Sequence, residues 1–164
     1  MRSSKKITLE NSAEFKQKLL IWAQQYHEFV WLDSNDYPQF YSSYDAVLAV
    51  DAHSVLQSNY LNAFTKLKNY KNEVNDFIFG YLSYDLKNDT ELLSSKNNDG
   101  LHFPDLYFFQ PKKLFLFKDN VLEIQYLLEN KNDINGDLKS IEQITSSQKG
   151  TRNDRNQYDV KIKK

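Results

Sequence analysis

The chain has no cysteine and only four glycines and three prolines among its 164 residues. The lack of cysteine excludes a disulfide framework, a thiolate zinc site, an iron–sulfur cluster and a cysteine nucleophile. The two closest glycines, Gly136 and Gly150, are fourteen positions apart, so the chain contains neither a GxGxxG loop nor a Walker A loop. No apolar run approaches the roughly 20 residues of a membrane-spanning helix, and the first twelve residues have no apolar secretory segment. We therefore expect a cytoplasmic protein that does not contact a membrane.

Charge of neither sign predominates. The chain has 21 basic and 22 acidic side chains, and the two halves of the sequence are balanced as well. A nucleic-acid-binding protein needs a basic surface for the phosphates, and no segment of this chain supplies one. We therefore expect no nucleic-acid partner. Hydrophobic residues make up 40% and aromatic residues 15% of the chain, which is enough for the core of one ordinary domain.

The spacing of apolar residues predicts a mixture of helices and strands, which is typical of an α+β fold. Asn11 and Glu14 form a capping box that begins a helix over 12–26, and Ser58 is predicted to cap a second helix over 58–71. Gly80 lies within a predicted strand, where a bulge or a close backbone approach would explain it. The predicted helices cover 12–26, 58–71, 137–144 and one or two turns within 86–93, and the predicted strands cover 29–32, 44–50, 76–84, 105–109, 113–117 and 121–127.

No residue pattern indicates catalysis or metal binding. His27, His53 and His102 have no second ligand at helical spacing, so we predict no metal site. Asp33 and Asp36 are a pair of carboxylates, but their place in a polar loop favours turn formation over acid–base chemistry. That loop, residues 33–43, lies between two apolar strands and is predicted to edge a small-molecule pocket.

Several segments, in order along the chain, together resemble the N-terminal domain of chorismate-utilising synthases, namely component I of para-aminobenzoate (aminodeoxychorismate) synthase and of anthranilate synthase. Residues 79–86 (FGYLSYDL) look like the family's GYLSYDL strand, and residues 103–108 (FPDLYF) follow at the expected distance. Residues 31–34 (WLDS) and 41–45 (YSSYD) are similar to its "LLxS…YSRYD" elements. Residues 154–158 (DRNQY) resemble the opening of its catalytic chorismate-binding domain.

The resemblance implies an α+β fold of antiparallel sheets flanked by helices. It divides the chain into a component I N-terminal domain over 1–146, and a linker with the first turns of a chorismate-binding domain over 147–164. In this family the substrate site and the glutamates that hold Mg²⁺ lie in the chorismate-binding domain. We therefore expect the 164 residues to be a fragment, with no catalytic residue and no cofactor of its own, and to be inactive alone.

The resemblance also implies the function and the partners of the whole enzyme. A para-aminobenzoate synthase aminates chorismate to 4-amino-4-deoxychorismate for folate biosynthesis, with ammonia from a glutamine amidotransferase subunit. In the family, the N-terminal domain carries a tryptophan pocket, which by matching motifs would be lined by Ser34, Tyr41, Ser42, Ser43 and Tyr44. Ser43 stands where the family has arginine.

Two alternatives remain open at this point. Asp33 takes the place of the glutamate that is typical of feedback-regulated anthranilate synthases, which favours the para-aminobenzoate enzyme. The first alternative is nevertheless the regulatory N-terminal domain of an anthranilate synthase. The second is a stand-alone module that binds a small molecule or another protein.

Overall fold

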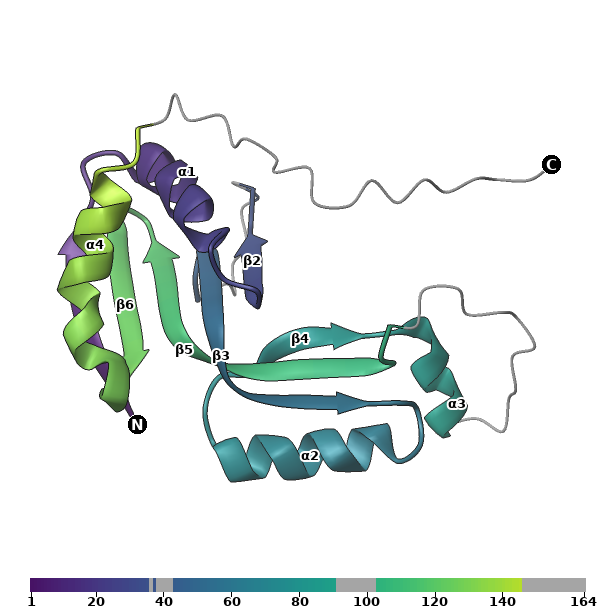
Figure 1. The fold of residues 1–164 in the computed structure, drawn as a ribbon. Coiled ribbons are helices and arrows are strands. Elements are labelled where there is room, and N and C mark those ends of the chain that lie inside the picture. The colour runs from purple at the N-terminus through teal and green to yellow at the C-terminus, as the bar shows by residue number, and fades with distance from the viewer. Residues whose placement is uncertain (36, 38–42, 91–102, 146–164) are drawn as a thin grey trace.

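The computed structural model describes residues 1–35, 37, 43–90 and 103–145. These residues form an α+β fold in which every paired strand is antiparallel to its neighbour (Figure 1). The sheet has the strand order β1-β6-β5-β3-β2, and β4 pairs with β5 as well. The expected fold class of antiparallel strands flanked by helices is thus confirmed, whereas the linker and helix predicted over 147–164 lie outside the described residues. The elements are β1 (Arg2–Thr8), α1 (Ser12–Ala23), β2 (Phe29–Asp33), β3 (Ala46–Ser58), α2 (Ala63–Val74), β4 (Phe79–Leu82), the 3-10 helix η1 (Tyr84–Leu86), α3 (Lys87–Thr90), β5 (Leu106–Lys118), β6 (Val121–Leu127), the 3-10 helix η2 (Leu128–Asp133) and α4 (Ile134–Glu142).

The sheet bends midway along its two longest strands, β3 and β5, so that its two halves point in different directions (Figure 1). The register between these strands shifts between Ala52 and Ser54, and Asp51 has a positive φ of 63°. Pro111 of β5 lies opposite Ala52 at this irregularity, where a residue without a backbone N–H is tolerated. The prediction of separate strands over 105–109 and 113–117 is therefore wrong, because Pro111 bends the strand without ending it.

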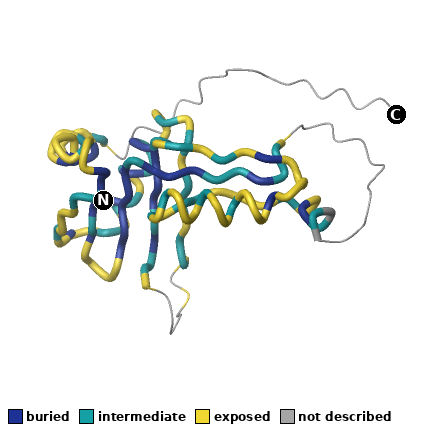
Figure 2. Tube along the Cα trace, turned by 90° about the horizontal axis from the view of Figure 1, so that it is seen from below, coloured by how far each residue is buried: buried dark blue, intermediate teal, exposed yellow. Residues whose placement is uncertain are grey.

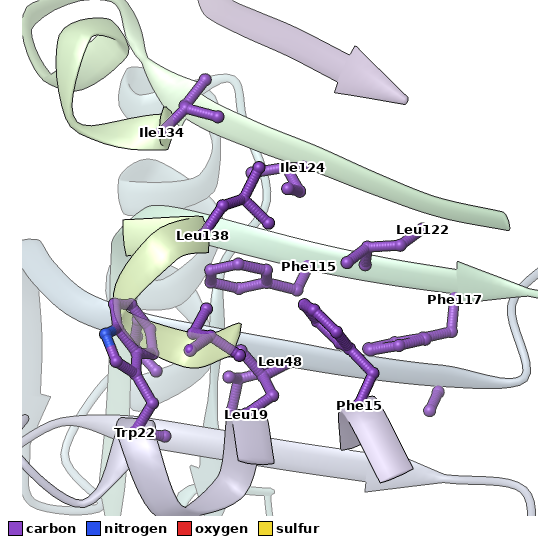
Figure 3. Packing of buried hydrophobic residues seen from close by; sticks show 14 of the residues in the cluster. Phe15, Leu19, Trp22, Leu48, Phe115, Phe117, Leu122, Ile124, Ile134 and Leu138 are labelled. Carbon is purple, nitrogen blue, oxygen red and sulfur yellow. The ribbon is translucent and has the colours of Figure 1, made fainter. Parts of the chain in front are cut away.

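One half of the sheet is covered by α1 and α4, and the main core lies between them and the strands. Phe15, Leu19 and Trp22 of α1 pack against strand residues such as Phe115 and Phe117 (Figure 3). The predicted cap of α1 is confirmed, since the Asn11 side chain accepts a hydrogen bond from the Glu14 backbone at 3.1 Å. The helix ends at Ala23, three residues earlier than predicted.

The other half of the sheet is covered by α2, most of which is exposed (Figure 2). Ala63 and Leu67 pack against residues of β3, η1 and β5, such as Leu106. The predicted cap at Ser58 is wrong, because Ser58 is the last residue of β3. Instead, the Asp89 carboxylate of α3 accepts hydrogen bonds from the backbone N–H groups of Asn62, at 2.8 Å, and Phe64, at 3.2 Å. A tertiary contact therefore supplies the cap that the local sequence lacks.

Candidate functional site

The two sides of the predicted loop are brought together where β2 ends and β3 begins. The Ser34 backbone N–H donates to the Asp45 carbonyl at 2.9 Å, and the Asp45 N–H donates to the Phe117 carbonyl at 2.8 Å. The first bond extends the β2–β3 pairing, and the second extends the pairing of β3 with β5. Residues before the loop and residues after it are consequently neighbours in space.

A cavity of about 310 Å³ lies beside this junction and is lined by three of the five residues predicted to bind tryptophan. Ser34 enters it from the end of β2, and Ser43 and Tyr44 enter it from the segment before β3. Tyr41 and Ser42 lie outside the described residues. The remaining lining residues are Leu32, Asp33, Asp45, Ala46 and Val47. Its volume is at the lower end of the range that small-molecule pockets occupy.

Asp45 is one of the two aspartates that line this cavity, the other being Asp33. The Asp45 carboxylate accepts a hydrogen bond from the Asp119 backbone at 2.6 Å and another from the Lys118 ammonium at 3.1 Å. The hydrogen bond from the Asp119 N–H is the largest influence and lowers the pKa of Asp45; burial opposes it, and the Lys118 ammonium lowers the pKa further. Asp45 is therefore ionised at neutral pH, which suits an acceptor for an ammonium group.

A larger and more polar cavity, of about 930 Å³, lies on the other side of Ser34. Lys16 of α1 lines it, with its ammonium 3.4 Å from the Asp33 carboxylate. Asp33 also accepts a hydrogen bond from the Asn35 backbone at 2.9 Å, and Asn35 has a positive φ of 50°. The interpretation of Asp33 as a turn-forming residue agrees with this geometry, and Asp36 lies outside the described residues. Together the two cavities offer an ammonium, carboxylates and hydroxyls to a polar ligand that carries both charges.

Residues 79–86, the segment that most resembles the synthase family, form part of the sheet and the turn after it. They do not line the cavity beside Ser34. Residues of the GYLSYDL segment make up β4 and η1, and β4 pairs with β5. The Ser83 backbone and hydroxyl donate to the Asp105 carbonyl, at 2.7 Å, and carboxylate, at 3.0 Å. A side chain at Gly80 would collide with the backbone of Tyr107 and Phe108. The predicted close backbone approach at Gly80 is thus confirmed.

Lys113 is a buried lysine that could be mistaken for a nucleophile. Its ammonium lies 2.7 Å from the Asp137 carboxylate and 3.1 Å from the Tyr26 hydroxyl. Burial lowers the pKa of Lys113, but these hydrogen bonds outweigh burial and raise it above its usual value. The amine therefore stays protonated, and this geometry does not suit covalent chemistry.

A third cavity, of about 520 Å³ and largely apolar, was not predicted from the sequence. It lies at the opposite end of β2 from Ser34, and its lining includes Glu28, Tyr81 and Tyr107. These residues come from three segments that are far apart in the chain, so no local pattern could have indicated them.

Among the described residues, no group of three or more histidine, aspartate or glutamate side chains could hold a metal ion. Within the same ranges, no helix is both long and apolar enough to cross a membrane. No protein-family model matches the chain, and no curated protein matches it.

Proposed function

We propose that this chain is the N-terminal, non-catalytic portion of a para-aminobenzoate synthase component I. The proposal rests on the ordered resemblance of residues 31–45, 79–86, 103–108 and 154–158 to that family. The α+β architecture with antiparallel strands agrees with it in fold class. One structural observation supports it most: Ser34, Ser43 and Tyr44, which the resemblance selects as pocket residues, line one cavity.

In this proposal the cavity beside Ser34 is one wall of a tryptophan pocket. An indole requires an apolar or aromatic surface, which Tyr44 and Leu32 offer. The amino-acid head requires hydrogen-bonding groups and opposite charges, for which Ser34 and Asp45 are suitable. A chorismate-binding domain would provide the second wall, so that this chain alone binds tryptophan weakly or not at all.

In this proposal, the catalytic steps take place outside this chain, in the chorismate-binding domain and in a partner subunit. Ammonia would come from a glutamine amidotransferase subunit, and chorismate would be aminated in the chorismate-binding domain. The proposal assigns Mg²⁺ to that domain as well, because the resemblance places the glutamates that hold it there. This chain would then support the catalytic domain and hold the tryptophan pocket.

Extending the coding sequence past codon 164 and assaying the encoded protein tests the proposal directly. We expect the reading frame to continue into a chorismate-binding domain, and the whole protein to convert chorismate and ammonia to 4-amino-4-deoxychorismate. Anthranilate and pyruvate as products would assign the chain to anthranilate synthase instead. A frame that encodes no such domain, or chorismate turnover by residues 1–164 alone, would overturn the proposal.

A further inference from the structure

The apolar cavity at the start of β2 lies where the two halves of the bent sheet meet. Its lining comes from β2 in one half and from β4 and the first part of β5 in the other. At about 520 Å³ it falls within the range of 300–1,000 Å³ that is typical of small-molecule sites. Apolar side chains such as Val30, Phe103 and Phe109 contribute much of the lining, so a ligand that enters the cavity leaves water.

Two tyrosines that line this cavity stack on each other. Tyr81 of β4 is the cross-strand partner of Tyr107 of β5, and their rings are nearly parallel, with an interplanar angle of 11° and centroids 5.9 Å apart. The pairing of the two strands holds the rings in this arrangement. Tyr81 remains 42% exposed, which leaves ring surface accessible to a ligand. The face of the Tyr81 ring that is turned away from Tyr107 therefore favours a planar aromatic group, which can stack on it with little loss of side-chain freedom.

The Glu28 carboxylate lines the same cavity as these two rings. Glu28 Oε1 lies 3.5 Å from the Tyr107 hydroxyl and 2.9 Å from His27 Nδ1. Burial raises the pKa of Tyr107, and the negative charge of Glu28 raises it further, so Tyr107 remains a neutral phenol beside an acidic group. Among the described residues, no lysine or arginine lines the cavity. The negative charge of Glu28 and the electron-rich ring faces therefore both favour a cation.

We infer that this cavity binds a small planar aromatic ligand that carries a protonated amine. The ring stacks on the exposed face of Tyr81, which Tyr107 supports from the other side, and the ammonium lies at the Glu28 carboxylate. An aromatic carboxylate of the same size fits the rings equally well, but it brings a second negative charge toward Glu28. The site is separate from the cavity beside Ser34, and the inference does not depend on the proposed function.

Two probes that share the same indole ring but carry opposite charges test the inference. Tryptamine and indole-3-propionate are titrated into isotope-labelled protein, and binding is followed by NMR and by calorimetry. We expect tryptamine to perturb the signals of Glu28, Tyr81 and Tyr107. Indole-3-propionate should bind at least about tenfold more weakly, which corresponds to about 1.4 kcal/mol.

Three variants separate the role of the charge from that of the rings. Glu28→Gln should abolish the preference for tryptamine while leaving the binding of indole-3-propionate unchanged or stronger. Tyr81→Ala should weaken both probes by about tenfold. The control is Glu129→Gln, which removes a carboxylate that pairs with His53 at 3.1 Å, much as Glu28 pairs with His27. It should alter neither affinity.

Several results would overturn the inference. They are equal affinity of the two probes for the unmodified protein, no binding of tryptamine, or signal changes confined to residues outside this cavity. Capture of apolar compounds irrespective of their charge would mark the cavity as a hydrophobic surface without a cation site. Because Glu28→Gln keeps the shape of the side chain, its effect on the charge preference decides the question even if Tyr81→Ala fails to fold.

Discussion

Arg2 Nε lies 2.9 Å from Asp76 Oδ1. This ion pair links the start of β1 to the short connection between α2 and β4. The same guanidinium donates to the Pro111 carbonyl at 2.6 Å and to the Gln125 carbonyl at 3.2 Å. The Arg2 side chain is only 8% exposed and that of Asp76 only 12%. Arg2 thus neutralises a nearly buried carboxylate and satisfies a backbone carbonyl at the bend of β5.

Removing this guanidinium should destabilise the fold strongly. Arg2→Ala leaves Asp76 almost buried without its cation and removes the hydrogen bonds to the Pro111, Lys112 and Gln125 carbonyls, which is expected to cost about 3–5 kcal/mol of unfolding free energy. Urea denaturation followed by circular dichroism measures the loss. Lys6→Ala is the control, since Lys6 pairs with Glu123 at 3.2 Å but is 67% exposed, and it should cost less than about 1 kcal/mol. Equal losses in the two variants would show that the Arg2 contacts contribute little.

The ionisation of Asp76 should make stability depend on pH. Burial alone would raise the pKa of Asp76, but hydrogen bonds from Arg2, Gln110 and the Phe77 backbone together lower it below the ordinary value of 3.8. A carboxyl with a lowered pKa in the folded state stabilises fully above its unfolded pKa, and this contribution disappears as pH falls through the folded pKa. We therefore expect the unfolding free energy to decline from about pH 5 downward. The decline should be smaller in Asp76→Asn, and an identical pH profile for the two proteins would contradict the assignment.

The two glycines described in the structure should respond to alanine in opposite ways. A Cβ at Gly80 would approach the Phe108 Cα to 2.7 Å and collide with the Tyr107 backbone, so Gly80→Ala must push β4 away from β5. We expect a loss of about 1–3 kcal/mol or more. Gly136 lies in α4, where an added Cβ would meet open space, so Gly136→Ala should stabilise by about 0.5–1 kcal/mol. Thermal denaturation of both variants measures the effects, and similar shifts in the same direction would contradict this account.

Local sequence signals predicted the elements whose stability is itself local. The Asn11 cap and the apolar spacing of Phe15, Leu19 and Trp22 predicted α1, and the strand predicted over 121–127 coincides with β6. The approach of the backbone to Gly80 followed from the cost of glycine in a strand. The helix cap and the apolar patterns need only neighbouring residues, whereas Gly80 indicates that a backbone approaches without identifying β5 as the strand that does so.

Other elements depend on contacts between distant residues. The strand β1 was not predicted, because its residues are mostly polar and it forms only by pairing with β6. The start of α2 was misplaced because its capping carboxylate belongs to Asp89, which is 27 positions from Asn62. The extent of β3 and β5 was underestimated, since the Pro111 bend is sustained by Arg2 and by cross-strand partners. Ser34, Ser43 and Tyr44 could be predicted to share one cavity because they flank a single loop. The stacking of Tyr81 on Tyr107 could not be predicted, because it depends on the register between β4 and β5.

The tryptophan pocket is the feature of the proposed function that single substitutions can test most sharply. In a protein that also carries the chorismate-binding domain, we expect tryptophan to bind with its indole beside Tyr44 and its head group at Ser34. Ser34→Ala removes a hydroxyl partner and should cost about 1 kcal/mol, or about fivefold in affinity. Tyr44→Ala removes the aromatic wall and should weaken binding further. Calorimetric titration measures both effects, and Ser140→Ala, an exposed serine that bonds the Gly136 carbonyl at 3.0 Å, is the control. If tryptophan binds and both pocket variants retain the full affinity, the pocket lies elsewhere, and residues 33–43 serve only as the connection between β2 and β3.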